Sequence, residues 1–175
     1  RHFGAEAEYL PCRYGELFPA DAEGRQVIVL DFSWSYGALL EAFNKGIHPL
    51  QIEIHDHHKT ARDDAKDYDL VMAMTRDEPA LLYHFDMDKS GAVLAWERFH
   101  QMPVPLLLEY VQDRDLWHFA LPNSREVSAW LSSYPYDFET WSNLNAMLDA
   151  HPDQVFNEGG AILRAQQCAV SVMCD

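Results

Sequence analysis

The chain has 175 residues, a length that suits one domain with a short extension and allows a sizeable buried core. Its hydrophobic content of 48% and aromatic content of 13% exclude a disordered chain. The formal net charge of -15 excludes a long nucleic-acid duplex bound through a basic face, whereas small anionic ligands stay compatible because bound divalent metals reverse the field of an acidic cleft.

Short apolar runs alternate with helix-like segments in the first half, a pattern typical of an α/β domain with a mainly parallel sheet flanked by helices. The run QVIVL is continuous and β-branched, as expected of a strand buried on both faces. The run LQIEI leads directly into a polar cluster. Strands are predicted at residues 8–14, 26–30, 50–54, 70–74 and 81–85, and a helix at 36–44.

Beyond residue 88 the pattern predicts a helical C-terminal part. Ala92, Ala95, Trp96 and Phe99 share one helical face, and Asp88 or Ser90 can cap that helix. Four more helices are predicted at 105–117, 124–133, 138–148 and 158–173. Core packing is the simplest role for the tryptophans of this half, Trp96, Trp117, Trp130 and Trp141.

Three cysteines form neither a CxxC pair nor a disulfide framework, so we expect a reducing, cytoplasmic compartment. No apolar run approaches the roughly 18 residues of a membrane span, and we expect no membrane partner. A homodimer is left open.

The most informative segment is IHDHHKTA, which places His55, Asp56, His57 and His58 directly after a predicted strand. In open α/β sheets, ligands bind at the carboxyl ends of the strands. Imidazole and carboxylate together suit Mn²⁺, Zn²⁺ or Fe²⁺ better than Ca²⁺. A polar turn with incidental histidines is the alternative.

Two further carboxylate sources follow apolar segments. Asp31 ends the preceding strand, so it shares a rim with the histidines if the strands are neighbours, and it could bridge two metals. A helix cap or turn residue is the alternative. Asp113 could coordinate metal, and Asp115 could orient a ligand or pair with Arg114. A solvated turn with a surface ion pair is the alternative there.

The DHH triplet after a strand, the Asp31 strand end, the SGA helix start at residue 90 and the segment QDRDLW at 112–117 resemble the DHH phosphoesterase superfamily. Within it the chain is most similar to the oligoribonuclease-like and phosphohydrolase branch. The resemblance covers roughly residues 1–120 and implies a Rossmann-like catalytic domain, here placed at 1–150, with residues 151–175 as a helix leading towards a second domain.

The resemblance also implies roles. Asp31 would be shared between two metals, His57 and Asp113 would be ligands, and His58 would be a second ligand or contact the scissile phosphate. Asp56 would hold a histidine tautomer. As a weaker inference, Ser90 and Gly91 would offer backbone N–H groups to a phosphate.

The chain departs from the family in two places. The family's Asp-x-Asp motif does not occur before residue 31, and its Gly-Gly-Gly-His-like loop is not found. Residues 1–4 resemble the tail of the helix that follows the motif. A fragment is therefore expected, with little activity by itself.

The implied reaction is hydrolysis of a small phosphate ester, such as a short oligonucleotide, a nucleotide or a cyclic dinucleotide, with two Mn²⁺ ions, although Mg²⁺ or another divalent metal also fits. One alternative is a catalytically degenerate protein that binds a nucleotide or a partner. Another is a mononuclear metal site on His55, His57 and His58, which the opposed directions of neighbouring side chains disfavour.

Overall fold

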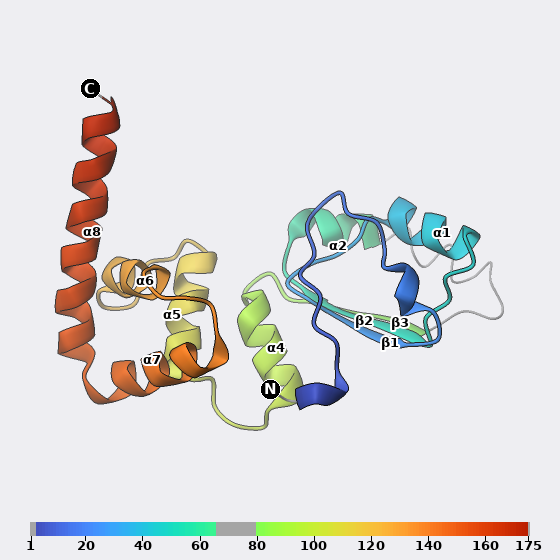
Figure 1. The fold of residues 1–175 in the computed structure, drawn as a ribbon, viewed down its shortest axis with the longest axis horizontal. Coiled ribbons are helices and arrows are strands. Elements are labelled where there is room, and N and C mark those ends of the chain that lie inside the picture. The colour runs from blue at the N-terminus through green and yellow to red at the C-terminus, as the bar shows by residue number, and fades with distance from the viewer. Residues whose placement is uncertain (1–2, 66–79, 175) are drawn as a thin grey trace. The chain divides into compact units, whose positions relative to one another are not determined.

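A computed structural model describes residues 3–65 and 80–174, which form two compact units, Arg1–Gln101 and Met102–Asp175 (Figure 1). The functional boundary predicted at residue 150 stays a prediction, although the compact units divide at a different place. Within the described part of the chain, no helix combines the length and apolarity needed to cross a membrane.

The first unit is built on a small parallel sheet. Strands β1 (Gln26–Leu30), β2 (Gln51–Asp56) and β3 (Ala80–Phe85) pair in the order β1-β2-β3, with Leu30 opposite His55 and His55 opposite His84. Short 3-10 turns lie at Gly4–Glu6 (η1) and Ala20–Ala22 (η2). The α/β class with a parallel sheet and flanking helices is confirmed.

Helices cover the two faces of this sheet differently. On one face, Ile52 and Ile54 of β2 are fully buried against α1 (Tyr36–Asn44), in a core that also holds Phe18 and Trp34 from the N-terminal segment. Helix α2 (Lys59–Ala65) contributes Ala65 to the same core. On the other face, Glu53 and His55 point towards α4 (Gly91–Phe99), because successive side chains of a strand alternate.

The second unit consists of helices α5 (Leu106–Asp115), α6 (Ser124–Ser132), α7 (Phe138–Ala150) and α8 (Pro152–Cys174). Trp130 is fully buried at its centre and donates a hydrogen bond from Nε1 to Glu158 at 3.0 Å. Gly159 lets α8 approach α6 closely, since a Cβ there would lie 2.1 Å from the carbonyl oxygen of Glu126. Four helices thus enclose their own apolar core.

Most predicted elements are confirmed within one or a few residues, although the helix predicted at 158–173 begins six residues earlier, at Pro152. The strand predicted at 8–14 is wrong. The described segment runs as coil into a turn at Gly15, whose φ is 90°. Pro11 cannot donate to a sheet ladder, and no backbone hydrogen bond seen in the described part joins this segment to β1. The core position predicted for Trp117 is also wrong, because this residue is 79% exposed. The core position predicted for Trp130 is confirmed, because this residue is fully buried. The strand predicted at 70–74 lies outside the described residues.

Candidate metal centre

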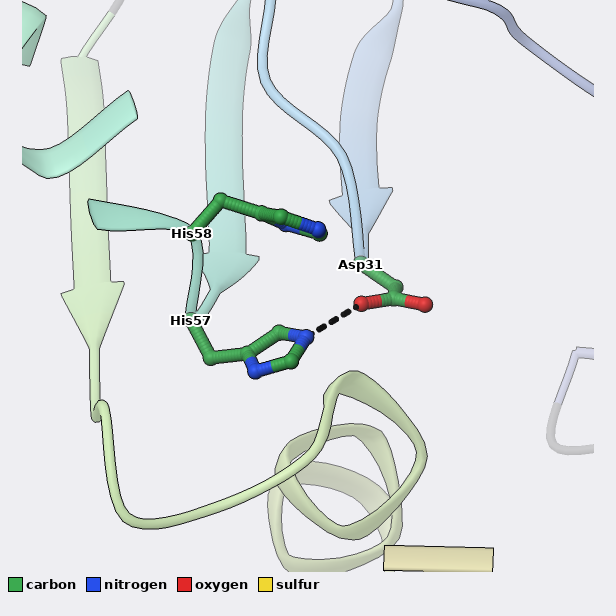
Figure 2. Close-up of side chains that lie close together, drawn as sticks. All are labelled: Asp31, His57 and His58. Atoms are coloured by element: carbon green, nitrogen blue, oxygen red, sulfur yellow. Dashed lines mark ion pairs between the residues drawn. The ribbon is translucent and has the colours of Figure 1, made fainter. Parts of the chain in front are cut away.

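The carboxyl ends of β1 and β2 meet at one edge of the sheet. Asp31 follows β1, and His57 and His58 follow β2 (Figure 2). The Asp31 Oδ1 atom lies 3.1 Å from His57 Nε2, and one potential ligand atom from each of the three residues lies within 4.8 Å of the others. The predicted meeting of Asp31 and His57 at this edge is confirmed.

Asp31 has an unusual backbone. Its φ is 58°, in the left-handed region that few residues other than glycine adopt, although aspartate is among those that tolerate it. Its N–H donates to the carbonyl of His55 at 2.9 Å, which continues the ladder one residue past β1. The side chain is 52% exposed. The conformation thus presents a carboxylate at the open rim of the sheet rather than in the core.

Gly91 provides the room for that carboxylate. A Cβ at Gly91 would lie 2.3 Å from Asp31 Cβ and 2.4 Å from Oδ1, so a larger residue would have to displace Asp31. Gly91 begins α4, and Ser90 caps the helix by accepting a hydrogen bond on Oγ from Val93 N–H at 3.3 Å. The positive end of a helix dipole favours a carboxylate at this position.

Asp56 is completely buried behind the histidines and accepts four hydrogen bonds. Its Oδ1 accepts from the N–H groups of His57 at 2.7 Å and His58 at 3.2 Å, and it lies 2.7 Å from His58 Nδ1. Its Oδ2 accepts from Ser33 Oγ at 2.6 Å. A carboxylate at Nδ1 keeps the ring proton there, which leaves Nε2 of His58 as the nitrogen able to bind a metal.

These residues fit a transition-metal ion. One carboxylate and two imidazoles are ligands that Mn²⁺, Fe²⁺ or Zn²⁺ accept, and a carboxylate behind a metal-binding histidine is a recurrent arrangement. The ring of Tyr14 lies edge-on to that of His58 with 6.0 Å between centroids. Burial and the charges of Asp56 and Asp31 raise the pKa of Tyr14, so its hydroxyl stays protonated near neutral pH.

The remaining predicted site residues have other surroundings. Asp113 lies in the second unit, 6% exposed, and accepts N–H groups from Ala120 at 2.9 Å and Leu121 at 3.1 Å. Burial raises the pKa of Asp113, but the nearby polar side chain of Ser124 and the N–H groups of Ala120 and Leu121 outweigh it and lower the pKa overall. Asp115 is exposed at the end of α5. Their roles as ligand and orienting residue stay predictions, as does phosphate binding at Ser90 and Gly91.

His55 belongs to a different group, which the sequence analysis missed. Its Nε2 lies 2.7 Å from Glu53 Oε1, and the ring of His84 stacks on its own ring with 4.6 Å between centroids. Arg98 of α4 donates to both oxygens of Glu53, from Nη2 at 3.2 Å and from Nε. The strand register, which no local pattern reveals, brings His84 beside His55. A mononuclear site on His55, His57 and His58 is therefore not the grouping observed.

Hydrogen bonding and burial set the protonation of Glu53 and His55. Hydrogen bonding from Arg98 is the largest influence on Glu53 and lowers the pKa of its carboxyl to about 2, against the opposing effect of burial. Burial lowers the pKa of His55. At neutral pH the group therefore holds an ionised carboxylate and a neutral imidazole.

Comparison with known proteins finds a relative whose name states no function. The chain is 29% identical over 141 residues to an uncharacterized protein of Acanthamoeba polyphaga mimivirus, in an alignment that covers 76% of this chain and 30% of the viral protein. The chain thus spans under a third of that relative's length. No protein-family model and no solved structure matches it.

Proposed function

We propose that this chain contributes a Mn²⁺ centre, held by Asp31, His57 and His58, to an enzyme that hydrolyses a small phosphate ester. The observation that carries the proposal is the gathering of one carboxylate and two imidazoles within 4.8 Å at the carboxyl ends of neighbouring parallel strands. Open α/β sheets bind their ligands at such ends. The same observation favours a place in the DHH phosphoesterase superfamily, with its Rossmann-like fold.

The surroundings of each residue support a specific role in binding the metal ion. A bound ion would supply an activated water and stabilise charge on the phosphate oxygens. The exposed carboxylate of Asp31 supplies negative charge at the rim. His57 and His58 supply neutral nitrogen ligands, and Asp56 keeps the proton of His58 on Nδ1 so that Nε2 can bind.

A second candidate is a nucleotide-binding protein without catalytic activity. The described part of the rim group contains a single carboxylate. A centre with few anionic ligands holds its ions weakly and activates water poorly. This candidate predicts Mn²⁺-dependent nucleotide binding without turnover.

Hydrolysis by the purified protein tests the proposal. We would measure release of product from a short oligoribonucleotide and from 3′-phosphoadenosine 5′-phosphate with added Mn²⁺. We expect turnover that falls by roughly a hundredfold or more in Asp31→Asn, which removes charge but keeps shape. Asp153→Asn, an exposed carboxylate to which the proposal gives no role, is the control.

Unchanged turnover in Asp31→Asn would remove Asp31 from the centre. Nucleotide binding without turnover in the purified protein would favour the second candidate instead.

A further inference from the structure

Glu53, His55 and His84 form a second group of potential metal ligands, on the sheet face next to α4. Glu53 and His55 alternate along β2, and His84 lies opposite His55 on β3. One potential ligand atom from each residue lies within 4.8 Å of the others. The Oε1 atom of Glu53 is central, at 2.7 Å from His55 Nε2 and 4.0 Å from His84 Nε2.

We propose that this group binds a Zn²⁺ ion at a site separate from the Asp31 centre. Two histidines and one glutamate are the protein ligands of one common type of zinc site, which leaves a fourth position open. Ligand atoms around a tetrahedral Zn²⁺ are about 3.3–3.5 Å apart, given bonds of roughly 2.0–2.1 Å. Shifts of about 1 Å or less would bring the Glu53 oxygen to that separation from both rings.

Burial separates this group from incidental surface residues. The side chains of Glu53 and His55 are 3% and 5% exposed, while that of His84 is 53% exposed. The two buried ligands are held on a strand, and the exposed one borders an open hollow that Gln26, Gln51 and Leu94 also line. An ion can therefore reach the group from solvent through the side of His84.

Arg98 is the group that competes with a cation. Its guanidinium donates to both oxygens of Glu53, and its side chain is 45% exposed, so it can turn outward. On binding, Oε1 would turn from His55 to the ion, and the neutral ring of His55 would carry its proton on Nδ1. Arg98 would give up its hydrogen bond to Oε1 and turn outward, which leaves that oxygen available to the ion.

The test uses a chain in which the Asp31 centre is disabled by His57→Ala, so that its outcome does not depend on the proposed function. Metal-free His57→Ala protein is titrated with Zn²⁺ by calorimetry, and with Co²⁺ to record the visible absorption of a tetrahedral site. We expect one ion per chain. Adding His84→Ala should abolish that binding and the Co²⁺ absorption, whereas adding His151→Ala, an exposed histidine of the second unit, should leave both unchanged.

A further variant addresses the competing explanation, in which Arg98, Glu53 and His55 form only a structural network. Adding Arg98→Gln to the His57→Ala chain removes the competing cation, and we expect Zn²⁺ affinity to rise severalfold. Circular dichroism confirms folding of each variant. Absence of Zn²⁺ binding in the His57→Ala chain, or its persistence after His84→Ala, would overturn the proposal. So would unchanged or weaker binding in the folded Arg98→Gln variant.

Discussion

Two aspartates that follow apolar segments have different surroundings in the two units. The side chain of Asp31 is 52% exposed at the sheet rim, with an imidazole nitrogen 3.1 Å away. Asp113 is 6% exposed, and both of its oxygens accept N–H groups from the turn between α5 and α6. A carboxylate that stabilises its own turn must give up those bonds to bind a metal, whereas one at an open rim beside histidines gives up less. In the sequence both aspartates simply follow an apolar segment, so the local pattern does not distinguish their surroundings.

Asp56 is buried like Asp113 and lies beside a histidine like Asp31. Its removal should have the largest effect on the free energy of unfolding. Asp56→Ala removes the buried acceptor of four hydrogen bonds, from the N–H groups of His57 and His58, the ring of His58 and the hydroxyl of Ser33. We expect the free energy of unfolding of the first unit to fall by about 3 kcal/mol, measured by denaturant titration. A loss below about 1 kcal/mol would mean that the buried carboxylate does little to hold the rim.

Glu53→Gln should have the next largest effect on the free energy of unfolding, and that effect should depend on pH. The folded-state pKa of about 2 lies below the ordinary value of 4.5, so ionised Glu53 contributes stability that is present above about pH 4.5 and lost as pH falls towards 2. At pH 7 we expect the variant to be less stable by about 2 kcal/mol. The difference from the parent chain should shrink between pH 5 and pH 2. A constant difference across that range would show that the charge is not the cause.

Local patterns predicted the elements of the first unit well. The strand predicted at 26–30 and the helix predicted at 36–44 follow from the pattern of neighbouring residues alone, and both are confirmed. The rim was predictable because each strand ends in potential ligands and parallel strands end together.

Features that depend on distant partners were not predictable. The extended residues 8–14 look like a strand, but a strand also needs a pairing partner. The grouping of Glu53 with His84 and Arg98 depends on strand register and on the docking of α4. The buried turn around Asp113 depends on how the chain folds back at Ala120. Helix α2, with the sequence KTARDDA, carries too few apolar residues to show helical periodicity.

Asp113→Asn tests the other side of the comparison between the two aspartates. Replacing one accepting oxygen by an amide should lower the free energy of unfolding of the second unit by about 1 kcal/mol. Asp115→Asn, at the exposed end of the same helix, should change it little. Calorimetric titration of both variants with Mn²⁺ sharpens the result, because a lower affinity in Asp113→Asn alone would add Asp113 to the metal ligands.

Gly91→Ala should have the smallest effect on stability and a larger one on metal binding. Alanine favours the helix by up to about 1 kcal/mol, which offsets part of the cost of displacing Asp31. We expect a change within about 1 kcal/mol in thermal unfolding and a Mn²⁺ affinity roughly tenfold lower. Gly37→Ala is the matched control, because a Cβ at that helix position meets nothing within 4 Å. Equal Mn²⁺ affinities in the two variants would mean that the position of Asp31 does not matter for binding.

The most direct test of the central claim is calorimetric titration of Mn²⁺ into the chain carrying His84→Ala, which disables the second group of ligands. We expect Mn²⁺ to bind in preference to Mg²⁺, because imidazoles join the carboxylate as ligands. Adding His57→Ala should lower the Mn²⁺ affinity by about tenfold or more, and adding His151→Ala should not. Equal Mn²⁺ affinity with and without His57 would contradict a metal centre at the meeting point of β1 and β2.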